Sequence, residues 1–216
     1  MNLAVYTSTT PELIKMLEKQ LQDQFTDRKL IIRSYQDPSI LQEARENGHV
    51  TFGCARRLLD LYEQAAKDGA EILLNVCSSV GDIAKLAKPL YTSTGLMFIR
   101  IDEEMAMDAV RTGTRIGVMG TLSTTMEPTK RLIYDCAARL ERDIIVVDGL
   151  VDGAFGLDQQ QFKQRLIDTA LEIKNQVDVL LFAQGSMAYA EEAVAAAAGL
   201  PVFSSIRYGA TQVKTA

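Results

Sequence analysis

The sequence predicts an α/β protein of two pseudo-symmetric domains, each built on a parallel four-stranded sheet. Short apolar runs alternate with longer amphipathic stretches along the whole chain, a pattern typical of parallel sheets with crossover helices. The pattern also repeats: a shift of 113 residues lays 3–5 on 116–118, and a shift of 107 residues lays 70–79 on 177–186 without gaps. We therefore expect two domains of one plan, with the active site in the cleft between them.

Eight apolar segments of strand length are predicted to form the two sheets. Most consist of Val, Ile and Leu bounded by polar residues or glycine, which favours buried strands. They are residues 3–6, 30–34, 71–76, 97–101, 115–119, 144–148, 178–182 and 202–205.

Seven segments between these strands have the periodicity of helices. Thr10 before Pro11 is typical of a helix start, and so is Ser186 before an alanine-rich run that ends at Gly199. The predicted helices are residues 11–24, 51–68, 80–86, 103–111, 127–140, 159–176 and 187–198. The tail 206–216 is expected to cross between the two halves.

The repeat also divides the chain into domains. The first is expected to span 1–95 and to include the C-terminal 206–216, and the second to span 96–205. A crossover segment at about 102–113 would connect them.

Composition excludes several classes of protein. The chain of 216 residues is 47% hydrophobic, enough for a sizeable core, and its net charge of −5 with scattered Lys and Arg argues against nucleic acid as a partner. No apolar run approaches the ~20 residues that span a bilayer, and no signal sequence is evident, so we expect a cytoplasmic protein without membrane contact.

The sequence also lacks the usual patterns of metal and cofactor sites. The three cysteines include no CxxC pair, there is a single histidine to add as a metal ligand, and GxGxxG and Walker patterns do not occur. We therefore predict no metal, nicotinamide, flavin or pyridoxal phosphate.

Cys77 is the strongest candidate for catalysis. It follows the predicted strand 71–76 and precedes a polar helix start, where backbone N–H groups and the hydroxyls of Ser78 and Ser79 favour a thiolate. The helix dipole contributes ~1 kcal/mol, less than one pKa unit, so full activation needs other groups in the pocket. The alternative is an inert buried thiol, which we expect for Cys54 and Cys136 within their helices.

Several segments together resemble the aspartate/glutamate/hydantoin racemase superfamily over nearly the whole chain. Residues 75–79, Asn-Val-Cys-Ser-Ser, are similar to its first cysteine loop, and 115–125 to the start of its second domain, with a Gly-Thr-x-x-Thr loop at 120–124 that binds a substrate carboxylate. Residues 101–105 are similar to the segment before its crossover helix. The resemblance implies a cofactor-independent enzyme that removes and returns the proton alpha to a carboxylate or amide with two cysteines, one per domain. We also expect a homodimer or higher homo-oligomer.

The second cysteine loop departs from this pattern. Residues 182–188 occupy it, and Gln184 stands where the second thiol should be. A glutamine forms hydrogen bonds but cannot carry a catalytic proton. Arylmalonate decarboxylase-like members of the superfamily also keep a single cysteine, although it is the second one.

The remaining candidates are small polar residues at predicted strand ends facing the cleft. They would bind the substrate's carboxylate through hydroxyl and backbone donors, although some could merely cap helices. The set comprises Thr7, Ser8, Ser78, Ser79, Thr121, Thr124, Thr125, Gln184, Gly185 and Ser186, with His49, in a polar loop, as a further possibility.

Three hypotheses follow for function. The first is a racemase- or isomerase-like enzyme that uses the Cys77 thiolate at the alpha carbon of a small carboxylic acid or amino-acid derivative. The second is a decarboxylase or hydrolase that uses Cys77, although a nucleophile needs a nearby base and the chain has one histidine. The third is a non-catalytic small-molecule binding protein of the same fold.

Overall fold

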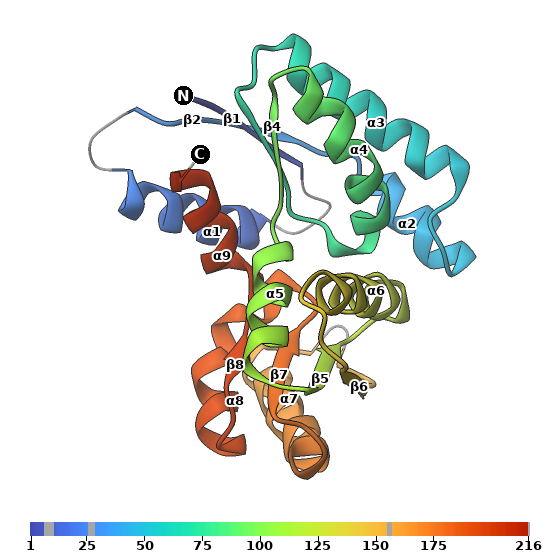
Figure 1. The fold of residues 1–216 in the computed structure, drawn as a ribbon, viewed down its shortest axis with the longest axis vertical. Helices are drawn as coiled ribbons and strands as arrows, with labels where there is room; N and C mark the ends of the chain where they lie inside the picture. Colours follow the sequence, from blue (N-terminus) through green and yellow to red (C-terminus); the bar gives the residue numbers. More distant parts are fainter. Residues whose placement is uncertain (7–10, 26–28, 155–156, 216) are drawn as a thin grey trace. The chain divides into compact units, whose positions relative to one another are not determined.

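The computed structural model describes residues 1–6, 11–25, 29–154 and 157–215. The chain divides into two compact units: unit 1 is Met1–Asp102 with Ile206–Ala216, and unit 2 is Glu103–Ser205. Each unit contains a four-stranded parallel sheet, drawn with its helices in Figure 1. The strand order is β2-β1-β3-β4 in unit 1 and β6-β5-β7-β8 in unit 2. The α/β class and the repeated plan predicted from the sequence are confirmed.

Unit 1 places helices on both faces of its sheet. Its strands are β1 (Asn2–Tyr6), β2 (Ile31–Tyr35), β3 (Ile72–Asn75) and β4 (Met97–Arg100). Its helices are α1 (Pro11–Gln24), α2 (Pro38–Asn47), α3 (Phe52–Lys67), the 3-10 helix η1 (Ser78–Val80), α4 (Gly81–Ser93) and α9 (Ser205–Thr215). Apolar side chains of α2, α3 and α4 form one core with the sheet, and α1 and α9 lie on the opposite face (Figure 1).

Unit 2 repeats this arrangement. Its strands are β5 (Arg115–Gly120), β6 (Ile145–Leu150), β7 (Val179–Phe182) and β8 (Val202–Phe203). Its helices are α5 (Glu103–Thr112), α6 (Ser123–Arg139), α7 (Gln159–Ile173), η2 (Lys174–Gln176), η3 (Gly185–Ala190) and α8 (Glu191–Ala198). The buried apolar side chains of α7 and α8 pack against those of β5, β7 and β8.

Two helices are absent from the prediction. Helix α2 begins after Asp37, whose side chain accepts the N–H of Ser39, and it ends at Gly48 with φ 72°; its polar exposed face obscured the periodicity. The tail forms α9, and Gly209 lies so close to Ile101 that any side chain there would clash. This tight contact fixes the tail on unit 1.

Other boundaries also differ from the prediction. Helix α4 continues to Ser93 through an internal Pro89, and α6 begins at Ser123 rather than 127. The 3-10 helix η1 precedes α4, which begins at Gly81, and the first residues of the helix predicted at 187 belong to the 3-10 helix η3 instead. The two units divide after β4 rather than before it, because β4 pairs with β3.

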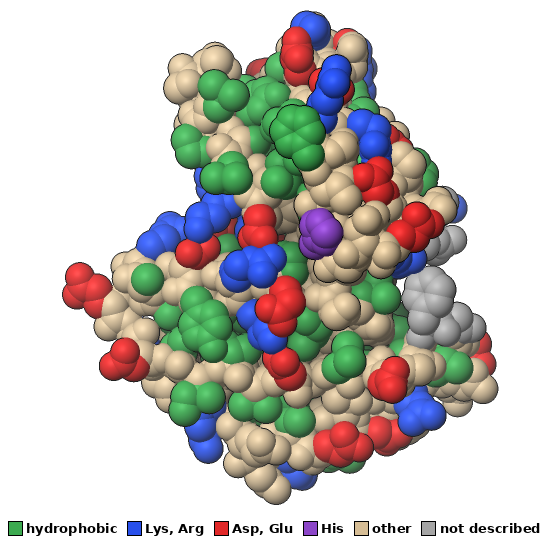
Figure 2. Space-filling view, turned by 90° about the vertical axis from the view of Figure 1, so that its right-hand side faces the viewer, with side chains coloured by type: hydrophobic (Ala, Val, Ile, Leu, Met, Phe, Trp, Pro, Cys, Tyr) green, Lys and Arg blue, Asp and Glu red, His purple; other side chains and the backbone are tan. Residues whose placement is uncertain are grey.

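The surface matches the composition. On the face drawn in Figure 2, Lys and Arg side chains are interspersed with Asp and Glu, so no large field of one sign forms. Within the described residues, no helix is both long and apolar enough to cross a membrane.

Candidate active site

Cys77 lies just beyond the carboxyl end of β3, an inner strand of the unit 1 sheet. The N–H of Val76 donates to the carbonyl oxygen of Tyr6 at 2.9 Å, which extends the β1–β3 ladder one step past the strand. The N–H of Val80 then donates to the carbonyl oxygen of Cys77 at 3.3 Å, closing the η1 turn. The thiol is 4% exposed and packs in the core formed with α2, α3 and α4.

Two buried phenols accompany this thiol. Tyr62 donates its hydroxyl to Asn75 Oδ1 at 2.8 Å, and Asn75 Nδ2 donates to the carbonyl oxygen of Cys77 at 3.1 Å. This chain of hydrogen bonds ties the backbone of Cys77 to α3. The Tyr6 ring meets Tyr62 edge-on with ring centroids 5.8 Å apart, but its hydroxyl is buried without a hydrogen-bond partner. An unmade hydrogen bond of this kind costs about 1–3 kcal/mol.

A buried ion pair supports the same region from β4. Arg100 and Asp102 are 2% and 1% exposed, and two guanidinium nitrogens of Arg100 meet the two carboxylate oxygens of Asp102 at 2.7 and 3.2 Å. A third nitrogen donates to the carbonyl oxygen of Gly81 at 3.0 Å, and the guanidinium fills the space that a side chain at Gly81 would need. The pair thereby fixes the start of α4 beside the Cys77 loop. This pair is absent from the sequence-based prediction, although the charged residues that close the apolar strand are a visible signal for it.

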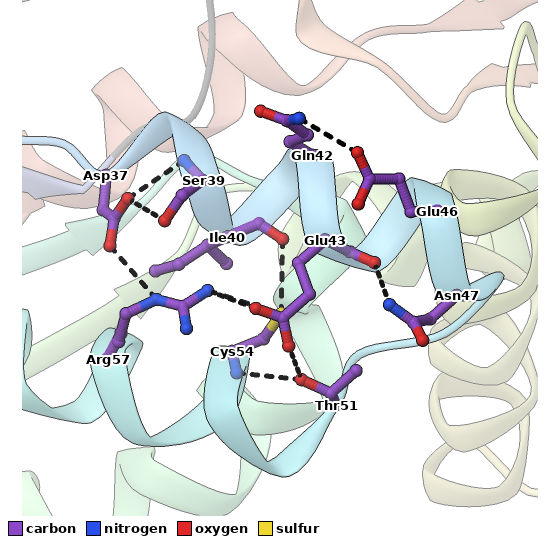
Figure 3. Close-up of polar contacts among 10 residues, drawn as sticks. All are labelled: Asp37, Ser39, Ile40, Gln42, Glu43, Glu46, Asn47, Thr51, Cys54 and Arg57. Carbon is purple, nitrogen blue, oxygen red and sulfur yellow. Dashed lines mark hydrogen bonds and ion pairs between the residues drawn. The ribbon is translucent and has the colours of Figure 1, made fainter.

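Cys54 belongs to a separate network between α2 and α3 (Figure 3). Its Sγ is fully buried and donates to the carbonyl oxygen of Ile40 at 3.4 Å. Glu43 accepts from Thr51, and from Arg57 at 2.7 Å; the Thr51 contact, followed by that of Arg57, lowers the pKa of the Glu43 carboxyl. These bonds hold α2 to α3, the packing role expected for Cys54.

His49 is exposed, and its Nδ1 lies 2.9 Å from the carbonyl oxygen of Asn47. The histidine, purple in Figure 2, is therefore on the surface of the loop between α2 and α3. Its role in a site stays a prediction.

Gln184 occupies the equivalent place in unit 2. It follows β7 as Cys77 follows β3, and the N–H of Ala183 donates to the carbonyl oxygen of Met119 at 2.8 Å, as Val76 does to Tyr6 in unit 1. The N–H of Met187 donates to the carbonyl oxygen of Gln184 at 3.0 Å, closing the start of η3. The same backbone geometry thus presents a thiol in one unit and an amide in the other.

The side chain of Gln184 is held in one orientation by Thr121. Its Oε1 accepts the backbone N–H of Thr121 at 2.7 Å and the hydroxyl at 2.9 Å. Because both bonds go to the oxygen, the Nε2 group is the end left to donate elsewhere. The hydroxyl proton of Thr121 is itself used in this contact.

The other predicted residues that the structure describes follow β3, β5 and β7. Thr124 and Thr125 are in the first turn of α6, and the Thr124 hydroxyl is buried without a hydrogen-bond partner. Ser78 and Ser79 are buried in η1, while Gly185 is half-buried and Ser186 exposed in η3. Thr7 and Ser8 lie outside the described residues.

No group of three or more His, Cys, Asp or Glu side chains in the described part of the chain is arranged to hold a metal ion. The three cysteines are buried thiols rather than disulfides.

Comparison with known proteins identifies the family. The family model described as Asp/Glu/Hydantoin racemase matches residues 3–213. The chain belongs to this family. A search of curated proteins finds no match.

Solved racemases share the fold of this Asp/Glu/hydantoin racemase family member at low sequence identity. An allantoin racemase from Klebsiella pneumoniae is 14% identical, with a TM-score of 0.65 and coverage of 100% of this chain and 86% of that one. A glutamate racemase from Bacillus anthracis is 15% identical, with a TM-score of 0.67 and coverage of 99% and 80%. An aspartate racemase from Picrophilus torridus is 12% identical, with a TM-score of 0.66 and coverage of 99% and 92%. These structures show the fold of this chain.

Proposed function

We propose that this chain is a cofactor-independent, racemase- or isomerase-like enzyme that acts at the alpha carbon of a small carboxylic acid or amino-acid derivative. The observation that carries the proposal is the equivalence of Cys77 and Gln184. Matching backbone hydrogen bonds place them after matching strands, but only Cys77 can exchange a proton near neutral pH.

In the proposed reaction the Cys77 thiolate takes the proton from the alpha carbon, leaving an enolate whose charge rests on the carboxylate or amide oxygens. Donors aimed at those oxygens supply the larger part of the catalytic effect in reactions of this kind. Gln184 Nε2 is one such donor, because Thr121 occupies the amide oxygen. The Cys77 thiol then returns its proton to the carbon.

The Thr124 hydroxyl supports a binding role for the loop after β5. It is buried in the first turn of α6 without a partner in the structure, and a substrate carboxylate is a suitable acceptor. We assign carboxylate binding to Thr124 and Thr125, with the backbone of Ser78, Ser79, Gly185 and Ser186 as further donors. The roles of Thr7 and Ser8 stay predictions.

A panel of acids tests this proposal. Aspartate, glutamate and related small acids, together with the neutral hydantoin allantoin, are incubated with the protein in deuterium oxide, and exchange of the alpha proton is followed by proton NMR. We expect at least one compound of the panel to exchange its alpha proton. The substitution Cys77→Ser should abolish this exchange, because a hydroxyl is a far weaker base than a thiolate. Exchange that persists in Cys77→Ser would overturn the role of Cys77.

Thiol reactivity separates the enzyme from a non-catalytic binding protein. A catalytic Cys77 should react with a small alkylating agent faster than Cys54 and Cys136 and should be protected by the exchanging acid. Equal reactivity of the three thiols, read by peptide mass spectrometry, would favour a binding protein that has lost its chemistry.

A further inference from the structure

The hydroxyl of Tyr6 is a buried donor that the packing of unit 1 leaves unused. Three buried side-chain atoms in the described residues lack a hydrogen-bond partner: Tyr6 Oη, Arg57 Nε and Thr124 Oγ1. Arg57 Nε lies 3.3 Å from a carboxylate oxygen of Asp37, and Thr124 belongs to the loop assigned to carboxylate binding. Tyr6 is 1% exposed and has neither explanation.

Tyr6 lies on the same face of the sheet as Cys77. It pairs with Asn75 in the β1–β3 register, and paired residues of neighbouring parallel strands point to one face. Cys77 follows Asn75 by two residues, which returns its side chain to that face. Tyr6 and Cys77 accordingly belong to the same core.

The titratable groups around this pair come from four elements. Arg57, Cys54 and Tyr62 belong to α3, and Asp37 lies at the start of α2. Arg100 from β4 and Tyr91 from α4 lie next to Tyr62. Burial and then the proximity of Cys77 raise the pKa of Tyr6, so the phenol keeps its proton throughout the working pH range. Tyr62 differs in one respect, since its proton is already donated to Asn75.

We propose that Tyr6 is a positioning residue for Cys77, whose ionised Sγ accepts a hydrogen bond from the Tyr6 hydroxyl. A neutral thiol is a weak acceptor, whereas a thiolate carries a full charge and accepts strongly. The unused donor therefore gains its partner when Cys77 ionises, which stabilises the thiolate relative to the thiol. The biological meaning of this contact rests on the proposed function, which requires the thiolate, but its test does not use catalysis.

The test is a pH titration of thiolate formation at Cys77. The ultraviolet absorbance of the thiolate is measured as the difference between each protein and the same protein carrying Cys77→Ser, so that Cys54 and Cys136 cancel. A hydrogen bond to a charged group contributes about 1.5–3 kcal/mol, so Tyr6→Phe should move the midpoint upward by about one to two pH units.

Tyr62→Phe is the matched control. It removes an equally buried phenol of the same aromatic cluster whose proton is already used, so it should move the midpoint far less than Tyr6→Phe. An unchanged midpoint in Tyr6→Phe, or equal shifts in the two variants, would overturn the proposal.

A second variant covers the case in which Tyr6→Phe does not fold. A ring-fluorinated tyrosine placed at position 6 alone keeps the shape of the side chain and makes its hydroxyl a stronger donor. The midpoint should then move downward, and an upward or absent shift would contradict the proposal. If Tyr6→Phe lost alpha-proton exchange without moving the midpoint, the proposed role of Tyr6 would be excluded. The role of Cys77 would be unaffected.

Discussion

Gln184 differs from a cysteine in what it can offer a substrate. Its Oε1 is occupied by two donors of Thr121, so the residue acts as a fixed N–H donor and has no proton to exchange. In the proposed reaction, this donor would let unit 2 bind a carboxylate or enolate oxygen without a second base.

Gln184→Glu tests this orientation. The carboxylate would keep the contact with Thr121 and replace the Nε2 donor with a charged oxygen, which repels an anionic substrate. Because a hydrogen bond to a charged group is worth about 1.5–3 kcal/mol, we expect the KM of the exchanging acid to rise by about ten- to a hundredfold. Thr121→Val, which removes one of the two holding bonds, should have a smaller effect, and an unchanged KM in Gln184→Glu would exclude the donor role.

Arg100 and Asp102 form the buried pair on which the start of α4 depends. Removing one partner leaves a buried charge uncompensated, so Asp102→Ala should lower the free energy of unfolding by about 3–5 kcal/mol, measured by urea denaturation. Glu63→Ala breaks an exposed pair with Lys67 and should cost less than about 1 kcal/mol. A similar decrease in the free energy of unfolding in the two variants would mean that the buried pair stabilises the protein no more than an exposed one.

Asp178 joins the starts of β5 and β7, at the opposite edge of the sheet from Gln184. Its carboxylate accepts two guanidinium N–H groups of Arg115 at 3.0 and 2.6 Å, and the backbone N–H groups of Arg115 and Thr114 at 2.8 and 3.0 Å. The bonds from Arg115, with that of Thr114, hold the pKa of Asp178 well below its usual range.

This depressed pKa gives the stability of the protein one pH-dependent contribution. A carboxyl whose pKa is lower in the folded state stabilises the protein above its unfolded pKa of about 3.9 and loses that contribution as pH falls through the folded value. Asp178→Asn should therefore lower the urea midpoint at neutral pH and have progressively less effect in acid. Asp143→Asn, at an exposed position, should change little, and an Asp178→Asn effect independent of pH would contradict this account.

The elements that sequence could predict are those with strong internal signals. Strand β3 is buried on both faces and its first three residues are apolar, and α1 begins and ends at the predicted residues. Helix α9 depends on the close approach of Gly209 to Ile101, far apart in the chain, and no local pattern reveals such a contact. Helix α2 does carry local signals, the Asp37–Pro38 start and the Gly48 end, but the polar residues between them hide the helical periodicity.

The candidate site, like the fold, was predictable only in part. The internal repeat placed Cys77 and Gln184 at equivalent strand ends, and the hydrogen bonds after β3 and β7 match it. The unused hydroxyl of Tyr6, the pair at Arg100 and the contact between Thr121 and Gln184 depend on side chains that meet only after folding. That Cys77 and Gln184 serve one substrate remains a prediction.

At the scale of the whole molecule, the two units share one plan but present different chemistry at the same place. In the proposed mechanism, an acid with a single alpha proton exchanges it through Cys77 alone, from one face, and is not racemised. The family's two-base chemistry would need a second thiol in unit 2.

The most direct test of this claim is the stereochemistry of exchange in deuterium oxide, followed by NMR and chiral chromatography for the acid found in the panel. We predict deuterium incorporation with retention of configuration in the unaltered protein, none in Cys77→Ser, and racemisation with deuterium incorporation in Gln184→Cys. Rapid racemisation by the unaltered protein would show that another group supplies the second base, and it would contradict the single-thiol account.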